Sequence, residues 1–485
     1  MLLKVIAEAL RARGLLAGPT PAAETEISSI GCDSRAVRPG QLFFAQGARF
    51  RREYLDEAVR RGAACYAAER DMGADCPLLL VSDIRKAMPA AAKVFYGDPA
   101  SKYLIAGVTG TKGKTTVTHM LYNVLSLHYG RGRAGMISTN CALSGVRDVR
   151  KEGGSTPEAL ELYRILNEFA EDGLKAACIE VSSQALQYDR VDGVEFDVGA
   201  FINLSPDHIS PTEHADFEQY KAAKARLLQT SRVGVVNIDD PYAGQIMAAA
   251  RCERIYTVSQ TQKADYRAEN IILSRRGSSF TVNGRQYEVM MPGAFNVVNA
   301  LTVIAMAEAM GCDARSIRLG VRGTSVAGRM EMYERDGVTV VVDYAHNEVS
   351  FEAVFDYLDE FYAGARKICL FGCQGNKALG RRTELPRVAG RRADLVILST
   401  DDPENEAPMA IISQVAAQLD RTGVPYVCIE DREQAVKYAV DIAQPGDVVF
   451  LAGKGRETTQ KVRGVSVPYK GDMPCAIEAF NRKGR

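Results

Sequence analysis

The sequence has no excess of charge of either sign, no polybasic run and no long apolar run. Lysine and arginine together number 60, as do aspartate and glutamate, so the formal net charge is zero. This balance lacks the electrostatic footprint of a nucleic-acid or membrane-surface protein. A membrane-spanning helix needs about 20 predominantly apolar residues, and no stretch of this chain provides them. We therefore expect neither nucleic-acid binding nor membrane insertion.

The 11 cysteines are scattered and odd in number, and no two form a Cys-x-x-Cys pair. Such thiols are typical of reduced core residues in a cytoplasmic protein. Cys369 and Cys373 have a spacing that suggests metal binding, but no second Cys or His pair lies near them in the sequence. The first 13 residues are apolar yet carry Glu8 and two arginines, which favours an amphipathic helix over a signal peptide.

A chain of 485 residues is too long for one ordinary core. Short apolar runs alternate with helical patterns, which predicts an α/β fold. We expect a small α/β unit over residues 1–100, a central unit with a parallel or mixed sheet over 101–331, and a doubly wound, Rossmann-like unit over 332–485. The strands are expected at 27–30, 42–45, 78–81, 103–106, 176–181, 196–201, 233–238, 338–342, 367–371, 395–398 and 448–451.

A glycine-rich loop at residues 107–116 follows one of these strands and precedes a helical pattern. The glycines let backbone N–H groups approach an anion, and the helix N-terminus adds partial positive charge. Lys114 would reach a β- or γ-phosphate, and the Thr115 hydroxyl would ligate Mg²⁺. The order of strand, turn and helix predicts a phosphate site, although the spacing Gly-x-x-Gly-x-x-Gly-Lys-Thr differs from the commonest phosphate loop.

Polar clusters follow two further strands of the central unit, at residues 180–184 and 203–208. Ligands bind at the carboxyl ends of parallel strands, so these clusters and the glycine-rich loop predict one site. A helix is expected to begin nearby, with Thr156 as its N-cap and Pro157 as its first residue. The third unit has its own polar strand ends but no phosphate loop.

These motifs resemble those of the Mur ligases, which are ATP-dependent amide-forming enzymes of peptidoglycan precursor synthesis. The resemblance covers essentially the whole chain and is closest to the branch that adds the third residue of the stem peptide. The segments that carry it are Asp33–Arg35 with Pro39-Gly40, 110–116, 155–158, 180–183, 203–208, 328–331 and 343–346. Lys112 stands where the family usually has asparagine.

The resemblance implies an acyl-phosphate mechanism and assigns roles residue by residue. Lys114, Glu180, His208 and Lys224 would be catalytic. The ATP contacts would be Gly110, Thr111, Lys112, Gly113, Lys114, Thr115, Thr116, Asn296, Arg329, Asp343, His346 and Lys377. The uridine-diphosphate sugar would contact Ser34, Thr156, Ser182, Gln184 and Arg190. The incoming amino acid would contact Asp401, Asp402, Glu404, Gly453 and Glu457. Lys377 and Arg381 lie in a glycine-rich loop, where they either clamp the nucleotide or the acyl phosphate or form a solvated basic loop.

Magnesium would be held by Thr115, Glu180 and His208. Lys224 matches the family lysine that carries a carbamate derived from CO₂, which would add a carboxylate-like ligand suited to a hard cation. Carbamoylation needs a neutral amine, which burial favours. A helix-surface lysine is the alternative.

The amino-acid substrate is expected from residues 401–404. The diaminopimelate-adding branch has Asp-Asn-Pro-Arg there, whose arginine pairs with a distal carboxylate. This chain has Asp401-Asp402-Pro403-Glu404, and an acid suits an ammonium instead. We therefore expect L-lysine to be added to UDP-N-acetylmuramoyl-L-alanyl-D-glutamate, with meso-diaminopimelate or ornithine as alternatives.

The sequence differs from the usual pattern of this branch at two places. Three other functions are alternatives. Gln184 replaces a usual histidine, and 209–214 carries extra residues that leave the roles of His208 and His214 unsettled. Folylpolyglutamate synthetase, a non-catalytic scaffold and a nucleotide switch or motor are the alternative functions. The long segment before the loop argues against the first, and the intact catalytic set argues against the second. We expect a monomer whose third unit closes over ATP.

Overall fold

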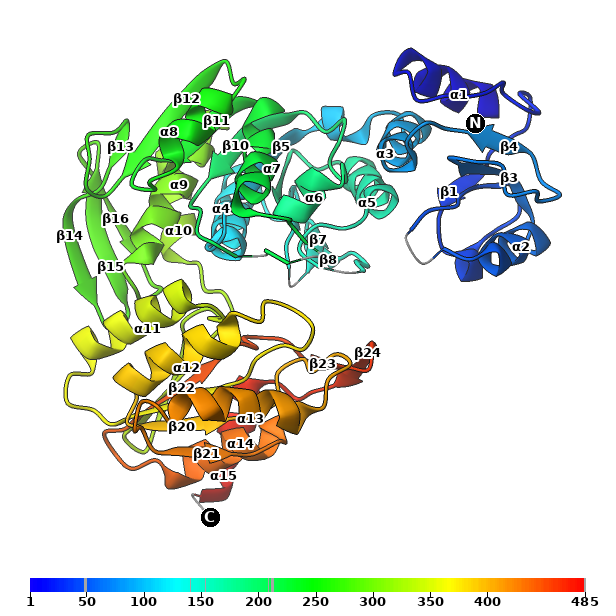
Figure 1. Cartoon of the computed structure of the whole chain (residues 1–485). Helices are drawn as coiled ribbons and strands as arrows, with labels where there is room; N and C mark the ends of the chain where they lie inside the picture. The colour runs from blue at the N-terminus through cyan, green and yellow to red at the C-terminus, as the bar shows by residue number, and fades with distance from the viewer. Residues whose placement is uncertain (48–49, 140, 153, 208, 211–212, 484–485) are drawn as a thin grey trace.

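A computed structural model describes residues 1–485 except 48–49, 140, 153, 208, 211–212 and 484–485. Figure 1 shows three bodies in chain order, with the blue N-terminal body at one end and the yellow-to-red body beneath the central green one. In the described part of the chain, no helix has the length and apolar character needed to cross a membrane.

The first body is a parallel sheet packed against amphipathic helices. Leu3, Ile6, Ala7 and Leu10 recur at helical spacing and are fully buried. The helical segments are α1 (Leu3–Ala12), η1 (Ser34–Ala36), α2 (Arg52–Arg60), α3 (Ile84–Phe95) and η2 (Pro99–Lys102). The strands, in spatial order, are β1 (Ser29–Gly31), β2 (Gln41–Phe44), β3 (Ala63–Ala68) and β4 (Leu78–Leu80).

The central body is built on a sheet that is parallel except at the β6–β7–β8 edge. Its strands, in spatial order, are β13 (Tyr266–Arg267), β12 (Arg254–Ser259), β11 (Ser231–Asn237), β10 (Phe196–Phe201), β5 (Leu104–Thr109), β9 (Ala176–Glu180), β6 (Ala134–Ile137), β7 (Ala142–Ser144) and β8 (Arg147–Asp148). Strand β9 is buried along its whole length, as expected when helices cover both faces of a parallel sheet.

Helices lie on both faces of this sheet. Ile105 packs into the cluster that includes α5, and its neighbour Ala106 packs into the cluster that includes α4 and α9. The helices are α4 (Lys114–Tyr129), α5 (Ala159–Glu171), α6 (Ser183–Gln187), α7 (Phe217–Gln229), α8 (Ala243–Ala249), α9 (Phe295–Ala309) and α10 (Ala314–Arg322). A separate antiparallel sheet comprises β14 (Glu269–Ser274), β15 (Gly277–Val282) and β16 (Arg285–Val289).

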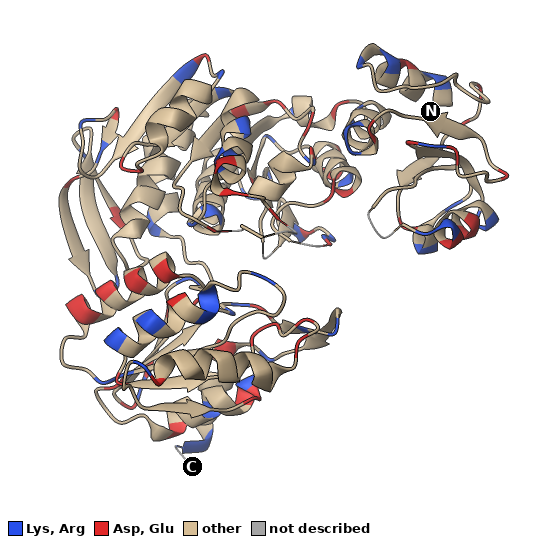
Figure 2. Cartoon of the chain, in the orientation of Figure 1, with Lys and Arg blue, Asp and Glu red and all other residues tan. Residues whose placement is uncertain are grey.

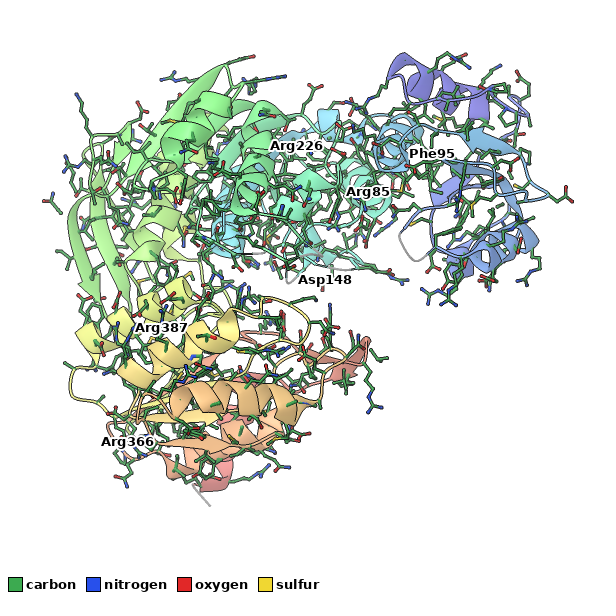
Figure 3. All side chains as sticks on the ribbon, viewed as in Figure 1. Arg85, Phe95, Asp148, Arg226, Arg366 and Arg387 are labelled. Carbon is green, nitrogen blue, oxygen red and sulfur yellow. The ribbon has the colours of Figure 1, made fainter. Side chains whose placement is uncertain are left out.

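The first and central bodies are joined by contacts of α3 and the N-terminal segment. The Arg85 guanidinium lies 4.3 Å from the centre of the Tyr188 ring, and Lys93 donates to the Gly193 carbonyl at 2.9 Å. Arg13 pairs with Asp192 at 2.6 Å. Figure 3 labels Arg85 and Phe95 on α3 and Arg226 on α7. The small body therefore rests against the side of the central one.

The third body is a doubly wound sheet whose edge strand β17 is antiparallel. Its strands, in spatial order, are β17 (Glu331–Arg335), β18 (Val338–Asp343), β22 (Val448–Ala452), β19 (Lys367–Phe371), β20 (Leu395–Leu398) and β21 (Tyr426–Cys428). A hairpin, β23 (Thr459–Val462) and β24 (Val465–Pro468), follows. The helices are α11 (Glu348–Phe361), α12 (Arg381–Arg392), α13 (Pro408–Leu419), α14 (Arg432–Ile442) and α15 (Asp472–Lys483).

Successive side chains of β18 point to opposite faces of the sheet, and each face is covered by its own layer of helices. Val341 packs with α11, α12 and α13, whereas Val340 and Val342 pack with α14 and α15. Ion pairs cross the outer surface between α11 and α12, visible as facing red and blue bands in Figure 2. The predicted multi-unit α/β fold is confirmed.

The expected start of helix α5 is wrong. Helix α5 begins at Ala159 with Glu158 as N-cap, so Thr156 and Pro157 precede it. The Thr156 hydroxyl donates to the Glu180 carbonyl at 2.7 Å and accepts from the Ser182 N–H, which removes it from capping. The expected strands also omit β3, β6, β7, β8, β12, β13, the β14–β16 sheet, β17, β21, β23 and β24.

Candidate active site

The loop between β5 and α4 has the backbone of a phosphate cradle. Gly110 and Gly113 have φ of +159° and +86°, and only the second lies well inside the left-handed region. A Cβ on Gly113 would stand 2.5 Å from Asn299 Oδ1. Glycine at 113 is therefore required both by the backbone and by the neighbouring side chain.

Two lysines converge on the first turn of this loop. Lys114 Nζ donates to the carbonyls of Gly110 and Thr111 at 2.9 and 3.2 Å. Lys224 Nζ donates to the same Gly110 carbonyl at 2.7 Å and lies 4.6 Å from the centre of the Tyr220 ring. Burial lowers the pKa of Lys114, and it lowers the pKa of Lys224 far below the usual lysine value. The loop thus carries concentrated positive charge and a buried, readily neutral amine.

Asn203 fixes the shape of the loop from the end of β10. Its Oδ1 accepts from the Lys112 N–H at 2.8 Å, its Nδ2 donates to the Lys112 carbonyl at 3.2 Å, and its carbonyl accepts from the Thr111 N–H at 2.9 Å. The Thr111 hydroxyl lies 3.1 Å from the Tyr220 hydroxyl. Sequence analysis placed Asn203 in the site but gave it no role. The side-chain amide of Asn203 therefore binds both the N–H and the carbonyl of Lys112.

Glu180 ends β9 with a fully buried carboxylate next to the loop strand. Thr139 binds both of its oxygens, through N–H and hydroxyl, each at 2.9 Å. These bonds orient the carboxylate and leave it further acceptor capacity. Glu180 and Thr115 supply the hard oxygen donors that Mg²⁺ prefers.

Of the metal ligands predicted from sequence, Thr115, Glu180 and Lys224 lie in the described part of the chain. His208 lies outside the described residues. Within the described ranges, no group of three or more His, Cys, Asp or Glu side chains is arranged to hold a metal ion. The donors Thr115 and Glu180 fit Mg²⁺ chemically, and phosphate oxygens and water complete such sites in many proteins.

The residues predicted for the uridine-diphosphate sugar fall into two groups. Ser34 lies in the first body, where its hydroxyl donates to Glu57 at 2.9 Å. Thr156, Ser182 and Arg190 lie together in the central body, with Arg190 donating to the Thr156 carbonyl at 3.2 Å. Gln184 lies at 3.5 Å from Glu213. Ser34 and the central group lie in different bodies, so one molecule would have to bridge them.

The phosphate loop is contacted by His346 of the third body and by Arg329, which lies just before that body in the chain. His346 Nε2 lies 3.1 Å from Lys112 Nζ, and Arg329 donates to the Thr115 hydroxyl at 3.4 Å. Asp343 accepts from the Met330 N–H at 2.8 Å. Burial lowers the pKa of His346 far below its usual value and raises that of Asp343. Burial also lowers the pKa of Lys112 to about 8.

A buried cluster that sequence analysis missed joins the two bodies. Asp207 accepts from Arg381 at 2.7 Å and from the Asn347 amide at 3.0 Å, and Lys112 lies 3.5 Å away. Asp207 and Arg381 are both at most 10% exposed at their side chains. Of the two predicted basic residues in this loop, Arg381 thus binds across the interface. Lys377 instead pairs with Glu404 at 3.0 Å.

Acidic side chains, two of them from the segment 401–404, surround Lys454. Lys454 Nζ lies 2.8 Å from Asp402, 2.6 Å from Glu457 and 3.8 Å from Asp401. Burial raises the pKa of Asp401 to about 6. Gly453 has φ of +101°, and its Cβ would stand 3.1 Å from Asp401 Oδ2. The structure therefore groups the predicted amino-acid residues, except Glu404, around Lys454, which sequence reasoning overlooked although it lies between two of them.

Asn296 is buried on α9 and bonds locally. Its amide donates to the Pro292 carbonyl at 2.7 Å, and its Oδ1 accepts from Asn299 at 2.9 Å. Asn299 is the residue that faces Gly113. Asn296 is thus connected to the phosphate loop through one side chain.

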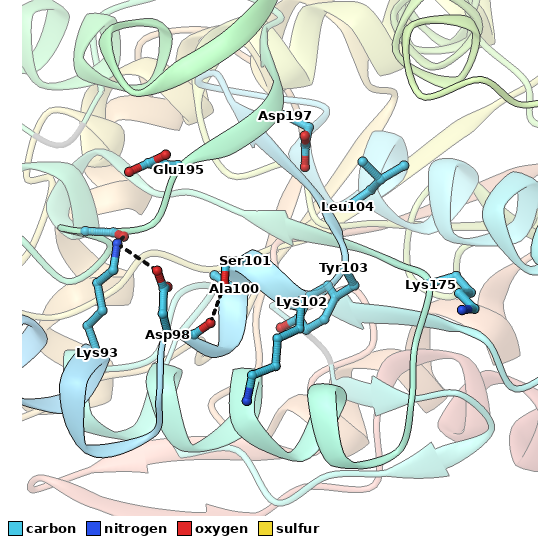
Figure 4. A pocket seen from close by; sticks show the side chains of 11 residues that line it. Lys93, Asp98, Ala100, Ser101, Lys102, Tyr103, Leu104, Lys175, Glu195 and Asp197 are labelled. Carbon is cyan, nitrogen blue, oxygen red and sulfur yellow. Dashed lines mark hydrogen bonds and ion pairs between the residues drawn. The ribbon is translucent and has the colours of Figure 1, made fainter.

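A cavity of about 430 Å³ lies at the amino ends of β5 and β10, at the opposite edge of the sheet from the phosphate loop (Figure 4). Its lining includes Lys93, Asp98, Lys102, Glu195 and Asp197, and the Asp197 carboxylate accepts from the Ile105 N–H. None of the predicted site residues lines it. The candidate site is instead the interface between the central and third bodies.

A phosphate loop faced by a second α/β body defines a class of nucleotide-dependent enzymes. The sequence matches the Mur ligase middle domain over residues 108–307 and the Mur ligase, glutamate ligase domain over residues 328–455. The chain belongs to the Mur ligase family.

Similar proteins cover the chain almost completely. A UDP-N-acetylmuramoyl-L-alanyl-D-glutamate--L-lysine ligase of Streptococcus mutans is 36% identical over 460 residues, 93% of this chain and 92% of the relative. A UDP-N-acetylmuramyl-tripeptide synthetase of Latilactobacillus sakei is 35% identical, with 93% of each chain covered. A solved UDP-N-acetylmuramoyl-L-alanyl-D-glutamate--2,6-diaminopimelate ligase matches with a TM-score of 0.65 at 28% identity, covering 97% of each chain. The resemblance inferred from motifs is confirmed.

Proposed function

We propose that this chain is an ATP-dependent ligase that joins L-lysine to UDP-N-acetylmuramoyl-L-alanyl-D-glutamate. The observation that carries the proposal is the 36% identity, over 93% of the chain, to an L-lysine ligase. The acidic character of residues 401–404 and 457 supports an amine-bearing substrate. A diaminopimelate-adding enzyme would need a cation for the distal carboxylate, and the ammonium of Lys454 is already bound to acids.

We propose one role for each body. The first, residues 1–100, binds the uridine-diphosphate end of the substrate near Ser34. The central body, residues 101–331, binds ATP and the acceptor carboxylate. The third, residues 332–485, binds the incoming amino acid. The separation between Ser34 and the Thr156–Arg190 group supports this, because an extended nucleotide-sugar-peptide spans two sites that a small ligand would not.

The first chemical step transfers the γ-phosphoryl group of ATP to the substrate carboxylate. An oxygen of the carboxylate attacks phosphorus, the bond to the β–γ bridging oxygen breaks, and ADP leaves. Such transfers depend on alignment and charge stabilisation. Lys114 neutralises the phosphoryl oxygens, and the loop N–H groups held by Asn203 bind the phosphates. Arg329, next to Thr115, adds positive charge from the end of the central body.

The second step forms the amide. The amine of lysine attacks the acyl phosphate, and phosphate leaves as the carbonyl is restored. The attacking nitrogen loses its proton to the departing phosphate, and the carboxylate of Glu457 would hold the amine during the attack. The contact of His346 with Lys112 keeps the third body against the loop and excludes water that would hydrolyse the acyl phosphate.

Magnesium would be bound by Thr115 and Glu180, with His208 and a carbamate on Lys224 as further proposed ligands. It would neutralise phosphate charge. The low pKa of Lys224 supports the carbamate, because only the neutral amine reacts with CO₂. Its hydrogen bond to the Gly110 carbonyl would have to be replaced on carbamoylation.

The experiment that tests this function measures phosphate release together with product mass. Purified protein with ATP, Mg²⁺, UDP-N-acetylmuramoyl-L-alanyl-D-glutamate and lysine should release one phosphate per lysine incorporated. Omitting lysine or the nucleotide-sugar should abolish steady turnover. ATP hydrolysis without any acceptor would instead indicate a nucleotide switch, and no hydrolysis would indicate a scaffold.

A further inference from the structure

The ammonium group of Lys454 is buried among acids of the protein itself. It lies 2.6 Å from Glu457 Oε2, 2.8 Å from Asp402 Oδ1 and 3.8 Å from Asp401 Oδ1, and its side chain is 1% exposed. Its two close contacts are with Glu457 and Asp402. Lys454 therefore holds these two carboxylates at fixed positions.

Tyr344 fixes the Glu457 carboxylate from the other side. The tyrosine hydroxyl donates to Glu457 Oε1 at 3.0 Å, while Lys454 binds Oε2. Each oxygen therefore has one partner from a different residue, which locks the side-chain rotamer. A carboxylate accepts about four hydrogen bonds, and the Glu457 side chain is 32% exposed. It retains acceptor positions that face outward.

The neighbouring acids also retain acceptors. Asp401 Oδ1 is buried and has no hydrogen-bond partner among the described residues. Both hydrogen bonds to Asp402 fall on its Oδ1, from Lys454 and from the Lys461 N–H. Three carboxylates with one internal ammonium leave a formal charge of −2. This arrangement suits the ammonium groups of a diamino acid.

The ring of Tyr344 connects this cluster to the phosphate loop. The Arg329 guanidinium lies 4.4 Å from the ring centre and donates to Thr115 at 3.4 Å. One side chain therefore contacts a carboxylate of the acidic cluster through its hydroxyl and a cation of the phosphate site through its ring. A cation over a tyrosine ring is an attractive contact.

We propose that Tyr344 and Lys454 are positioning residues that hold Glu457 ready for the amine of the incoming diamino acid. Tyr344 additionally sets the distance between that carboxylate and the phosphate loop through Arg329. The inference rests on the proposed ligase function and assigns roles that the function itself does not require of either residue.

The test is Tyr344→Phe, which removes only the hydroxyl and keeps the ring against Arg329. A lost hydrogen bond to a charged group corresponds to about a tenfold change in binding. We expect the KM for the amino acid to rise about tenfold while the KM for ATP is unchanged. Tyr344→Leu, which also removes the ring, should raise both KM values.

Tyr426→Phe is the matched control, because its hydroxyl likewise donates to a carboxylate inside the third body, that of Asp420 at 2.7 Å. It should leave both KM values unchanged. Lys454→Met should raise the KM for the amino acid in the same direction as Tyr344→Phe. If its melting curve shows that it does not fold, Tyr344→Phe alone decides.

Equal rises in both KM values for Tyr344→Phe, or no rise in either, would overturn the proposal. The wild-type protein is assayed first with lysine, meso-diaminopimelate and ornithine, and the variants are then measured with whichever it uses. Failure of wild type to use lysine contradicts the proposed function. Failure of Tyr344→Phe to change the KM of the accepted amino acid contradicts only the positioning role.

Discussion

The chemistry of Lys224 depends on burial. Burial lowers the pKa of its amine far below the usual lysine value, which favours the neutral form. We predict a carbamate on Lys224, detected by ¹³C NMR after exchange with labelled bicarbonate. Lys224→Met should abolish the signal and lower kcat by roughly 10²-fold, the scale seen when one electrostatic stabiliser is removed.

Lys221 on the same helix is the control, because it bonds Glu218 and is partly exposed. Lys221→Met should keep the signal. The absence of a signal from wild type, or full activity of Lys224→Met, would contradict the assignment.

The lowered pKa of Lys224 also determines whether the free energy of unfolding rises or falls with pH. The folded state binds fewer protons at this group than the unfolded state between the folded pKa and about 10.4. The free energy of unfolding contributed by this group therefore rises with pH across that window. Lys224→Met should flatten this part of the pH profile in denaturant titrations of the unmodified protein. An unchanged slope would contradict burial of a neutral amine.

Among the elements, the turn from β5 to α4 is held by the end of β10. Asn203→Ala would remove the side-chain bonds to the N–H and carbonyl of Lys112. The loop N–H groups would then be less ordered, so we expect the KM for ATP to rise about tenfold. Asn167→Ala, on the exposed face of α5 where its amide bonds Glu171, is the control. An unchanged KM for ATP in Asn203→Ala would show that the loop keeps its shape without this clamp.

The strands differ in how well the sequence predicts them, and the differences have physical reasons. Strands such as β10 and β19 were placed well, because their apolar runs are fully buried and bounded by polar residues. Strand β3 was missed because its sequence, Ala-Ala-Cys-Tyr-Ala-Ala, has few β-branched residues. In the β14–β16 sheet, Asn283-Gly284 between short alternating runs is a hairpin signal that was available.

At the site, motif order predicted which residues gather at the phosphate loop. It could not predict partners that come from another body. Asp207 and Arg381 are 174 positions apart in the chain, and their pairing depends on how two sheets meet. Thr156 was misassigned as a cap because local sequence does not reveal that its hydroxyl is bonded to the end of β9.

For the molecule as a whole, the Asp207–Arg381 pair holds the third body against the phosphate loop. Removing one partner of a buried pair costs about 3–5 kcal/mol, so Arg381→Gln should favour an open arrangement. We expect a larger radius of gyration in small-angle scattering and a lower kcat. Arg391→Gln, which breaks an exposed pair with Glu352, should change neither.

Ligand-driven closure stays a prediction, and the same variant tests it. A nucleotide analogue with the nucleotide-sugar should reduce the radius of gyration of Arg381→Gln more than that of wild type, whose third body already contacts the loop. No difference between the two proteins would count against the pair as the contact that holds the bodies together.

An amino-acid panel in the phosphate-release assay decides whether this Mur ligase adds lysine. With UDP-N-acetylmuramoyl-L-alanyl-D-glutamate and ATP fixed, kcat/KM is compared for L-lysine, L-ornithine and meso-diaminopimelate. The acidic cluster around Lys454 predicts the highest value for L-lysine and little turnover with meso-diaminopimelate, whose distal carboxylate meets acids. A higher kcat/KM for meso-diaminopimelate than for lysine would show that the enzyme does not select lysine.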